Sequence, residues 1–128
     1  MKTMRLSDFI LLGEKEKKFT VLHQGILVGK REKDDRKVFL FQLENIINDR
    51  YEHPKEDSYV NRLREKGLNK IAQKVGEEGV ETVIAALPES REDLINEASD
   101  LVFHLLVLLR EKNLSLKTIA ANLEQRHQ

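Results

Sequence analysis

Several residue types that constrain a fold or a chemistry are rare or missing in this chain. It has no cysteine and no tryptophan, and only two prolines, five phenylalanines and two tyrosines. Without cysteine there is no disulfide framework and no thiolate metal site, which suits a reducing compartment such as the cytoplasm. With so few aromatic rings, the hydrophobic core has to be built from Leu, Ile, Val and Ala side chains.

Excess charge of either sign is missing as well. Lys plus Arg and Asp plus Glu both number 22, so the formal net charge of the 128 residues is zero. A strongly basic surface for nucleic acid or membrane is therefore not expected. No apolar run reaches the roughly 18 residues that span a bilayer, and the first residues lack the apolar core of a signal peptide. We expect a cytoplasmic protein of one domain, without a nucleic-acid or membrane partner.

Residues 1–37 differ in pattern from the rest of the chain. Two short apolar, β-branched runs at residues 19–23 and 26–28 flank Gln24-Gly25, a pattern typical of a small β-hairpin. Residues 30–37 carry charges of both signs, which favours a solvated loop. We treat residues 1–37 as an N-terminal extension of unknown role, and residues 38–128 as the main domain.

The main domain has the apolar periodicity of α-helices. Helices are predicted over residues 39–51, 58–65, 68–86, 90–112 and 116–125. Ser58, Ser90 and Ser115 stand at the expected N-caps, and Gly67 at the expected C-cap of the short second helix. Residues 101–109 are apolar almost all round, which is typical of a helix buried on every side. One short chain has few helices to surround such a segment, so we expect an all-α bundle completed by a homodimer.

Two acidic motifs stand on neighbouring predicted helices. They are Glu78-x-x-Glu81 and Glu97-x-x-Asp100, and a turn at Pro88 lies between them. The i, i+3 spacing puts both acids of a motif on one helix face. If the turn folds the second helix back on the first, the four carboxylates converge between two antiparallel helices.

The position of these acids on the helices indicates a metal site. At about 100° per residue, Glu78 falls within the apolar arc of its helix, and Glu97, Asp100 and His104 share a narrow face of theirs. A carboxylate that faces a core is expected to be paired, protonated or bound to a metal, and Mg²⁺ prefers such all-oxygen sites. The alternative is that these are solvated acids on charged helices, since 34% of the residues are charged.

The acidic motifs belong to a longer stretch that resembles a known family. Residues 38–128 are similar to phosphoribosyl-ATP pyrophosphohydrolase, an enzyme of histidine biosynthesis. The similarity is strongest in KIAQKVGEEGVETVIAA, residues 70–86, and continues through Glu97-Ala98-Ser99-Asp100-Leu101 and His104-Leu105-Leu106. The wider group is the all-α, MazG-like nucleotide pyrophosphohydrolases. Some relatives carry a fused cyclohydrolase domain with cysteines upstream. Residues 1–37 do not resemble it, so we expect one activity in this pathway.

The resemblance implies a reaction and a cofactor. The reaction is Mg²⁺-dependent hydrolysis of phosphoribosyl-ATP to phosphoribosyl-AMP and pyrophosphate, in which water attacks at the α–β anhydride. Glu78, Glu81, Glu97 and Asp100 are then the Mg²⁺ ligands. Two rival functions use the same pattern differently. One is hydrolysis of dUTP or a damaged nucleotide by a housecleaning enzyme, and the other is a helical dimerisation module without activity.

Other polar residues near the acids are candidates for the chemistry. Glu77 either orients and deprotonates the attacking water or is a solvated surface acid. Lys70 and Lys74, one turn apart, are candidates to bind phosphate, although Lys74 also stands at i, i+4 from Glu78 and would pair with it. His104 is either a substrate contact or a hydrogen-bonded structural residue. Asp57, Ser58 and Tyr59 are predicted to form a loop that closes over the nucleotide.

Overall fold

The computed structural model of the chain describes residues 33–87 and 90–127. They form a 3-10 helix, η1 (Lys33–Val38), and five α-helices, α3 (Phe39–Glu52), α4 (Tyr59–Lys66), α5 (Leu68–Ala86), α6 (Arg91–Glu111) and α7 (Leu116–Arg126). No strand occurs in these ranges, and the predicted all-α, MazG-like fold is confirmed. The hairpin predicted within residues 19–28 and the turn at Pro88 lie outside the described residues.

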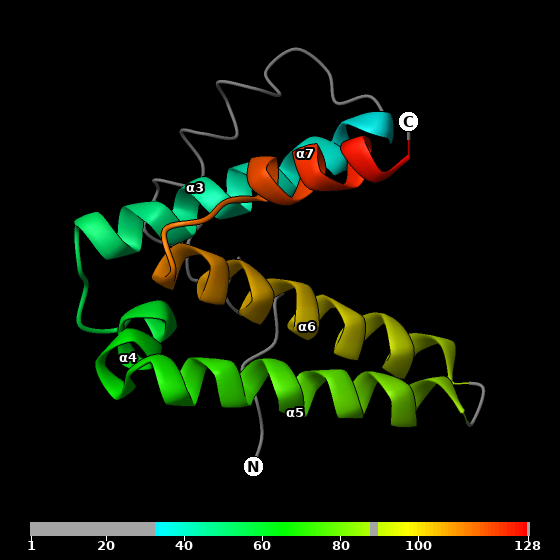
Figure 1. Cartoon of the computed structure of the whole chain (residues 1–128). Coiled ribbons are helices and arrows are strands. Elements are labelled where there is room, and N and C mark those ends of the chain that lie inside the picture. The colour runs from blue at the N-terminus through cyan, green and yellow to red at the C-terminus, as the bar shows by residue number, and fades with distance from the viewer. Residues whose placement is uncertain (1–32, 88–89, 128) are drawn as a thin grey trace.

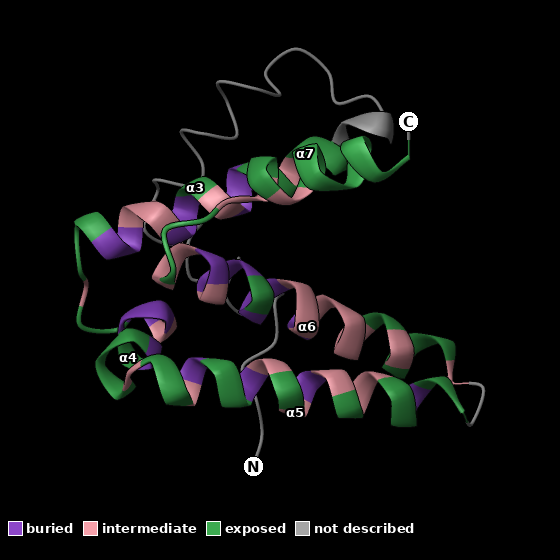
Figure 2. Ribbon diagram, in the orientation of Figure 1, coloured by how far each residue is buried: buried purple, intermediate pink, exposed green. Residues whose placement is uncertain are grey.

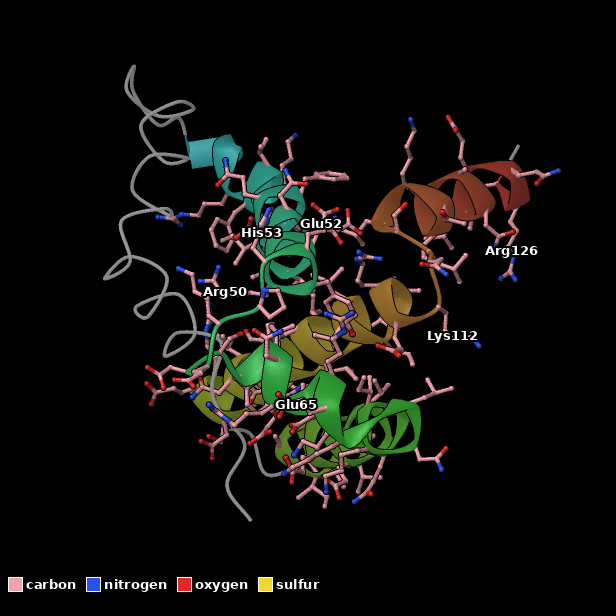
Figure 3. The ribbon with its side chains drawn as sticks, turned by 90° about the vertical axis from the view of Figure 1, so that its left-hand side faces the viewer. Arg50, Glu52, His53, Glu65, Lys112 and Arg126 are labelled. Carbon is pink, nitrogen blue, oxygen red and sulfur yellow. The ribbon has the colours of Figure 1, made fainter. Side chains whose placement is uncertain are left out.

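The fold is organised around a long helical hairpin. Helices α5 and α6 run antiparallel along most of their length and form the largest contact between elements (Figure 1). Helix α3 crosses the end of the hairpin where α6 finishes, and the short α4 occupies the corner between α3 and α5 (Figure 1). Helix α7 overlaps α3 in Figure 1, but the view turned by 90° shows it to one side of α3 (Figure 3).

The helix boundaries follow the predicted caps. The Ser58, Ser90 and Ser115 hydroxyls each accept a hydrogen bond from the backbone N–H three residues further on, at 3.3, 3.3 and 3.4 Å. Each bond satisfies one of the N–H groups that a helix start leaves without a partner. Gly67, between α4 and α5, has φ of +95°, a conformation that side-chain-bearing residues rarely adopt. The sequence therefore encodes where α4, α5, α6 and α7 begin.

The hydrophobic core occupies one end of the hairpin. Its buried side chains come from α3, α4, the start of α5 and the second half of α6. They are Leu43, Ile46, Ile47, Tyr51, Val60, Leu63, Ile71, Phe103, Leu106, Val107 and Leu109. Burying each Leu, Ile or Phe contributes roughly 1.5–3 kcal/mol, so this end of the hairpin holds α3 and α4 in place. Figure 3 shows Arg50, Glu52 and His53 where α3 ends and the chain turns toward α4.

One sequence-based prediction is wrong just before the main domain. Residues 33–37 were expected to be part of a solvated loop, but they form most of η1, which leads directly into α3. The side chains of Arg36 and Lys37 are exposed, and both stand in the last turn of η1, where positive charge is favourable. A short helical turn can therefore form without any apolar face of its own.

The other end of the hairpin has an uncovered apolar surface. Val80, Val83 and Ile84 of α5 are exposed, as are Leu87, the C-cap residue of α5, and Ile95 of α6. Val83 is 61% and Leu87 77% exposed, and Figure 2 shows this end of the hairpin mostly in the colours of exposed and partly exposed residues. Within residues 101–109, Leu105 is also exposed. One chain therefore does not bury the segment that was expected to be buried on every side.

Candidate active site

Three of the four predicted metal ligands come together between α5 and α6. Glu78, Glu81 and Glu97 each offer a carboxylate oxygen, and these oxygens lie within 4.8 Å of one another. Glu78 is fully buried, whereas Glu81 and Glu97 are partly exposed. We call these three residues the acid cluster. The inner faces of the antiparallel helices bring it together, as the spacing of the two motifs predicts.

The acid cluster holds more negative charge than its surroundings stabilise. Burial raises the pKa of Glu97 to about 7, with further contributions from a hydrogen bond to Glu81 and from the charges of Glu81, Glu78 and Asp100. Like charges at this separation cannot all ionise easily, so a proton is retained near neutral pH. In addition, Oε1 of Glu97 is buried and has no hydrogen-bond partner among the described residues.

These features fit a hard divalent cation. Mg²⁺ takes oxygen ligands, and a cation would satisfy the buried Glu97 oxygen and offset both the burial and the like charges that raise its pKa. Asp100, the fourth predicted ligand, is buried at 4% exposure but is not one of the three residues of the acid cluster. Its charge nevertheless acts on Glu97 and Tyr59.

A buried lysine lies against the acid cluster. Lys74 of α5 is only 2% exposed, and its ammonium is 3.3 Å from Oε1 of Glu77 and 3.7 Å from Oε2 of Glu78. The sequence left two roles open for Lys74, phosphate binding or pairing with Glu78. The structure contains the ion pair with Glu78. Glu77 also accepts a hydrogen bond from Gln73 at 2.7 Å, and these partners lower the pKa of its carboxyl. Glu77 is consequently ionised at neutral pH.

His104 and Tyr59 join α6 to α4 beside the acids. His104 is fully buried, with Nδ1 2.7 Å from the Asp100 carbonyl and Nε2 2.8 Å from the Tyr59 hydroxyl. A carbonyl only accepts, so Nδ1 carries the proton, and the Tyr59 hydroxyl donates to Nε2. Burial lowers the pKa of His104 to about 4, and burial with the charges of Glu78 and Asp100 raises the pKa of Tyr59 to about 12. These hydrogen bonds match the alternative in which His104 is a hydrogen-bonded structural residue.

The loop before α4 is fixed by a residue that sequence reasoning missed. Asn61 is buried, accepts a hydrogen bond from the Lys55 N–H at 2.8 Å and donates to the Arg50 carbonyl at 2.9 Å. Ser58, predicted to contact the nucleotide, is buried at 6% exposure and caps α4. The signal available in the sequence was the position of Asn61 between two apolar residues, Val60 and Leu63. An amide that points into the core needs hydrogen-bond partners there.

The remaining predicted residues lie closer to solvent. Lys70 is partly exposed one turn before Lys74, and Asp57 is exposed in the loop before α4. The Asp57 carbonyl accepts a hydrogen bond from Arg62 at 3.2 Å. Lys70 can therefore meet a ligand that approaches α5 from solvent, whereas the Lys74 ammonium is already engaged with carboxylates.

The fold and the acid cluster define the class of this protein. It is an all-α, MazG-like protein, in which two antiparallel helices present E-x-x-E and E-x-x-D motifs toward each other. Within that class, the chain belongs to the phosphoribosyl-ATP pyrophosphohydrolase family, whose family model matches residues 40–127. The match includes the acid cluster and its neighbours, and it begins just after η1.

Named relatives fall into two groups. The phosphoribosyl-ATP pyrophosphatase of Clostridium acetobutylicum is 47% identical over 94 residues, which are 73% of this chain and 86% of that protein. The histidine biosynthesis bifunctional protein HisIE of Escherichia coli K12 is 52% identical over 91 residues, 71% of this chain and 45% of that protein. The HisIE of Yersinia pestis is 49% identical over 90 residues. The chain thus spans less than half the length of these bifunctional relatives.

No helix among the described residues has the length and apolar character to cross a membrane.

The raised pKa of Glu97 predicts a pH dependence of the metal-free protein. A carboxyl whose folded pKa, about 7, exceeds its usual 4.5 binds its proton more tightly when folded. Its contribution to stability is therefore present at low pH and is lost as the pH rises through 7. Between pH 5.5 and 8 in EDTA, the wild type should lose about 1 kcal/mol of unfolding free energy relative to Glu97→Gln, after allowance for partial solvent screening.

Urea unfolding at several pH values measures this difference. His104, whose lowered pKa acts with the opposite sign, is common to both proteins and cancels in the comparison. Glu92→Gln, an exposed acid in the first turn of α6, is the matched control and should follow the wild type. Parallel pH profiles of wild type and Glu97→Gln would show that Glu97 titrates normally.

Proposed function

We propose that this protein hydrolyses phosphoribosyl-ATP to phosphoribosyl-AMP and pyrophosphate, a step of histidine biosynthesis, and that the acid cluster binds Mg²⁺ for this reaction. The observation that supports the site most strongly is the meeting of Glu78, Glu81 and Glu97 within 4.8 Å, with a buried Glu97 oxygen lacking a partner among the described residues. Family membership over residues 40–127 supports the substrate. A cytoplasmic location follows from the proposed pathway and remains a prediction.

The residues of the hairpin have separate roles in the proposed reaction. Glu78, Glu81 and Glu97 would hold the cation, with Asp100 beside them as the fourth acid. When bound, Mg²⁺ polarises phosphoryl oxygens, favours ionisation of a water molecule and balances the charge of the leaving pyrophosphate. Glu77, ionised and at the edge of the cluster, would accept a hydrogen bond from the attacking water and orient it. The bond that forms joins the water oxygen to the α-phosphorus, and the bond that breaks is the α–β anhydride.

Substrate contacts are proposed on both sides of the acids. Lys70, on the solvent side of α5, would meet the phosphate chain as a point charge. Tyr59, which is partly exposed, would form a wall of the nucleotide site. The buried His104 would support it, through its hydrogen bond to the Tyr59 hydroxyl and through ring packing with a centroid distance of 5.7 Å. Ser58 caps α4 and would support the site by fixing the start of that helix. Asp57 lies in the loop before α4.

The apolar surface at the open end of the hairpin supports a homodimer. Val80, Val83, Ile84 and Leu87 are exposed at the helical spacing of one face of α5 and its C-cap, and Ile95 is exposed on α6, which packs against α5. Burial of the corresponding surface of a second copy would complete a four-helix bundle. The rival function of a dimerisation module would use this surface too. It would not require the acid cluster, because three converging carboxylates weaken a structure that gains nothing from them.

A substrate panel tests the proposed function. We expect Mg²⁺-dependent pyrophosphate release from phosphoribosyl-ATP at a kcat/KM at least about 100-fold above that for ATP or dUTP. A site that contacts polar groups of its own substrate discriminates strongly against analogues that lack them. Preference for dUTP would favour the housecleaning enzyme. Release from none of the three nucleotides would contradict both enzyme functions and favour the dimerisation module.

A further inference from the structure

The burial of Lys74 is unusual for a residue expected to bind substrate phosphate. At 2% exposure it is buried about as deeply as the core residues around it, and Glu78, its i+4 neighbour, is at 0%. An ammonium is taken out of water only at a large cost, unless carboxylates compensate it. Lys74 has two such carboxylates, at 3.3 Å in Glu77 and 3.7 Å in Glu78.

Ion pairs on α5 connect Lys74 to the acid cluster. Its ammonium pairs with Glu77 and with the buried Glu78. Glu78 is also one of the three residues of the acid cluster. Lys74 therefore stands where a positive charge offsets the repulsion among the acids, on the side of the cluster that is closed to solvent.

We propose that Lys74 is an internal counter-ion of the acid cluster and not a phosphate ligand. Its ammonium holds the Glu78 carboxylate in place while no metal is bound, so the cluster is assembled before a cation arrives. The same charge repels an incoming cation, and Lys74 thereby sets the Mg²⁺ affinity below the value that three unopposed carboxylates would give. The statement about Mg²⁺ affinity depends on the proposed metal function, whereas the counter-ion role does not.

Two measurements on Lys74→Met test the two statements. In EDTA at pH 8, loss of the counter-ion should lower the melting temperature by about 5 °C or more, because breaking a buried ion pair leaves an uncompensated charge. In calorimetric titration, Lys74→Met should bind Mg²⁺ at least about threefold more tightly than the wild type. Saturating Mg²⁺ should accordingly raise its melting temperature more than that of the wild type.

Lys70→Met is the matched control. It removes the same charge one turn earlier on α5, from a partly exposed side chain. We expect its melting temperature in EDTA and its Mg²⁺ affinity to match the wild type within error, while its KM for phosphoribosyl-ATP rises. A Lys74→Met variant that behaves in this way, with raised KM but unchanged stability and Mg²⁺ affinity, would overturn the proposal in favour of phosphate binding.

A double variant covers the case in which Lys74→Met does not fold. If Lys74 is needed because Glu78 is charged, Glu78→Gln should restore folding and most of the melting temperature to Lys74→Met. Additive effects of the two substitutions would overturn the counter-ion role. If the wild type binds no Mg²⁺, the metal function fails and with it the statement on affinity. The double-mutant cycle in EDTA then still decides the counter-ion role.

Discussion

Glu81→Gln and Glu97→Gln should each lower Mg²⁺-dependent turnover by about 100-fold or more, while leaving the metal-free protein as stable as the wild type or up to ~1 kcal/mol more stable. The two effects have one cause. The acid cluster holds carboxylate oxygens within 4.8 Å, and Glu97 already retains a proton near neutral pH. An uncharged amide therefore relieves repulsion in the absence of metal, and it removes a ligand charge when the cation is needed.

Thermal melts with and without Mg²⁺, combined with pyrophosphate-release assays, measure both effects. Added Mg²⁺ should raise the melting temperature of the wild type, because a ligand that binds only the native state stabilises it, and the increase should shrink in both Gln variants. Glu92→Gln makes the same chemical change at an exposed site of α6 and should keep both the turnover and the Mg²⁺-induced rise in melting temperature of the wild type. Gln variants that lose stability in EDTA but keep full turnover would assign the acids a structural role instead.

Val83→Asp should separate the protein into single chains. Val83 is 61% exposed at the centre of the apolar surface on α5, and a buried charge without a partner at a dimer interface costs several kcal/mol. At micromolar concentration we expect the wild type to sediment at twice the chain mass of 14.9 kDa. The variant should dissociate at least about 100-fold more readily.

Leu123→Asp on α7 controls for the general effect of adding a charge to an exposed apolar residue. Leu123 is 48% exposed but lies outside the hairpin surface, so this variant should remain dimeric. Analytical ultracentrifugation over a range of concentrations distinguishes the three proteins. A wild type that is a folded monomer at micromolar concentration would contradict the dimer and require another cover for the apolar surface.

The helices and their caps could be predicted from the sequence because their determinants are local. The apolar periodicity of residues 68–86 and the serines at positions 58, 90 and 115 depend only on neighbours along the chain. The convergence of Glu78, Glu81 and Glu97 was also predictable, since one antiparallel turn between two i, i+3 motifs is enough to produce it.

The parts of the site that were not predicted depend on packing between distant segments. Tyr59 and His104 are 45 residues apart, and only the placement of α4 against α6 brings the hydroxyl to 2.8 Å from Nε2. The sequence left the role of Lys74 open because i, i+4 spacing does not reveal burial, which the structure sets at 2% exposure. A helical wheel also does not fix where a side chain ends, and Asp100, although it shares a helix face with Glu97, is not one of the three residues of the acid cluster.

The central claim is that the acid cluster between α5 and α6 holds a divalent cation. Substoichiometric Mn²⁺, a paramagnetic stand-in for Mg²⁺, tests it in amide NMR spectra of the EDTA-treated protein, because the bound ion broadens the signals of nearby residues. The account predicts selective loss of the amide signals around Glu78, Glu81 and Glu97, recovery on addition of excess Mg²⁺, and no effect on α7. Uniform broadening, or broadening centred on another part of the chain, would contradict it.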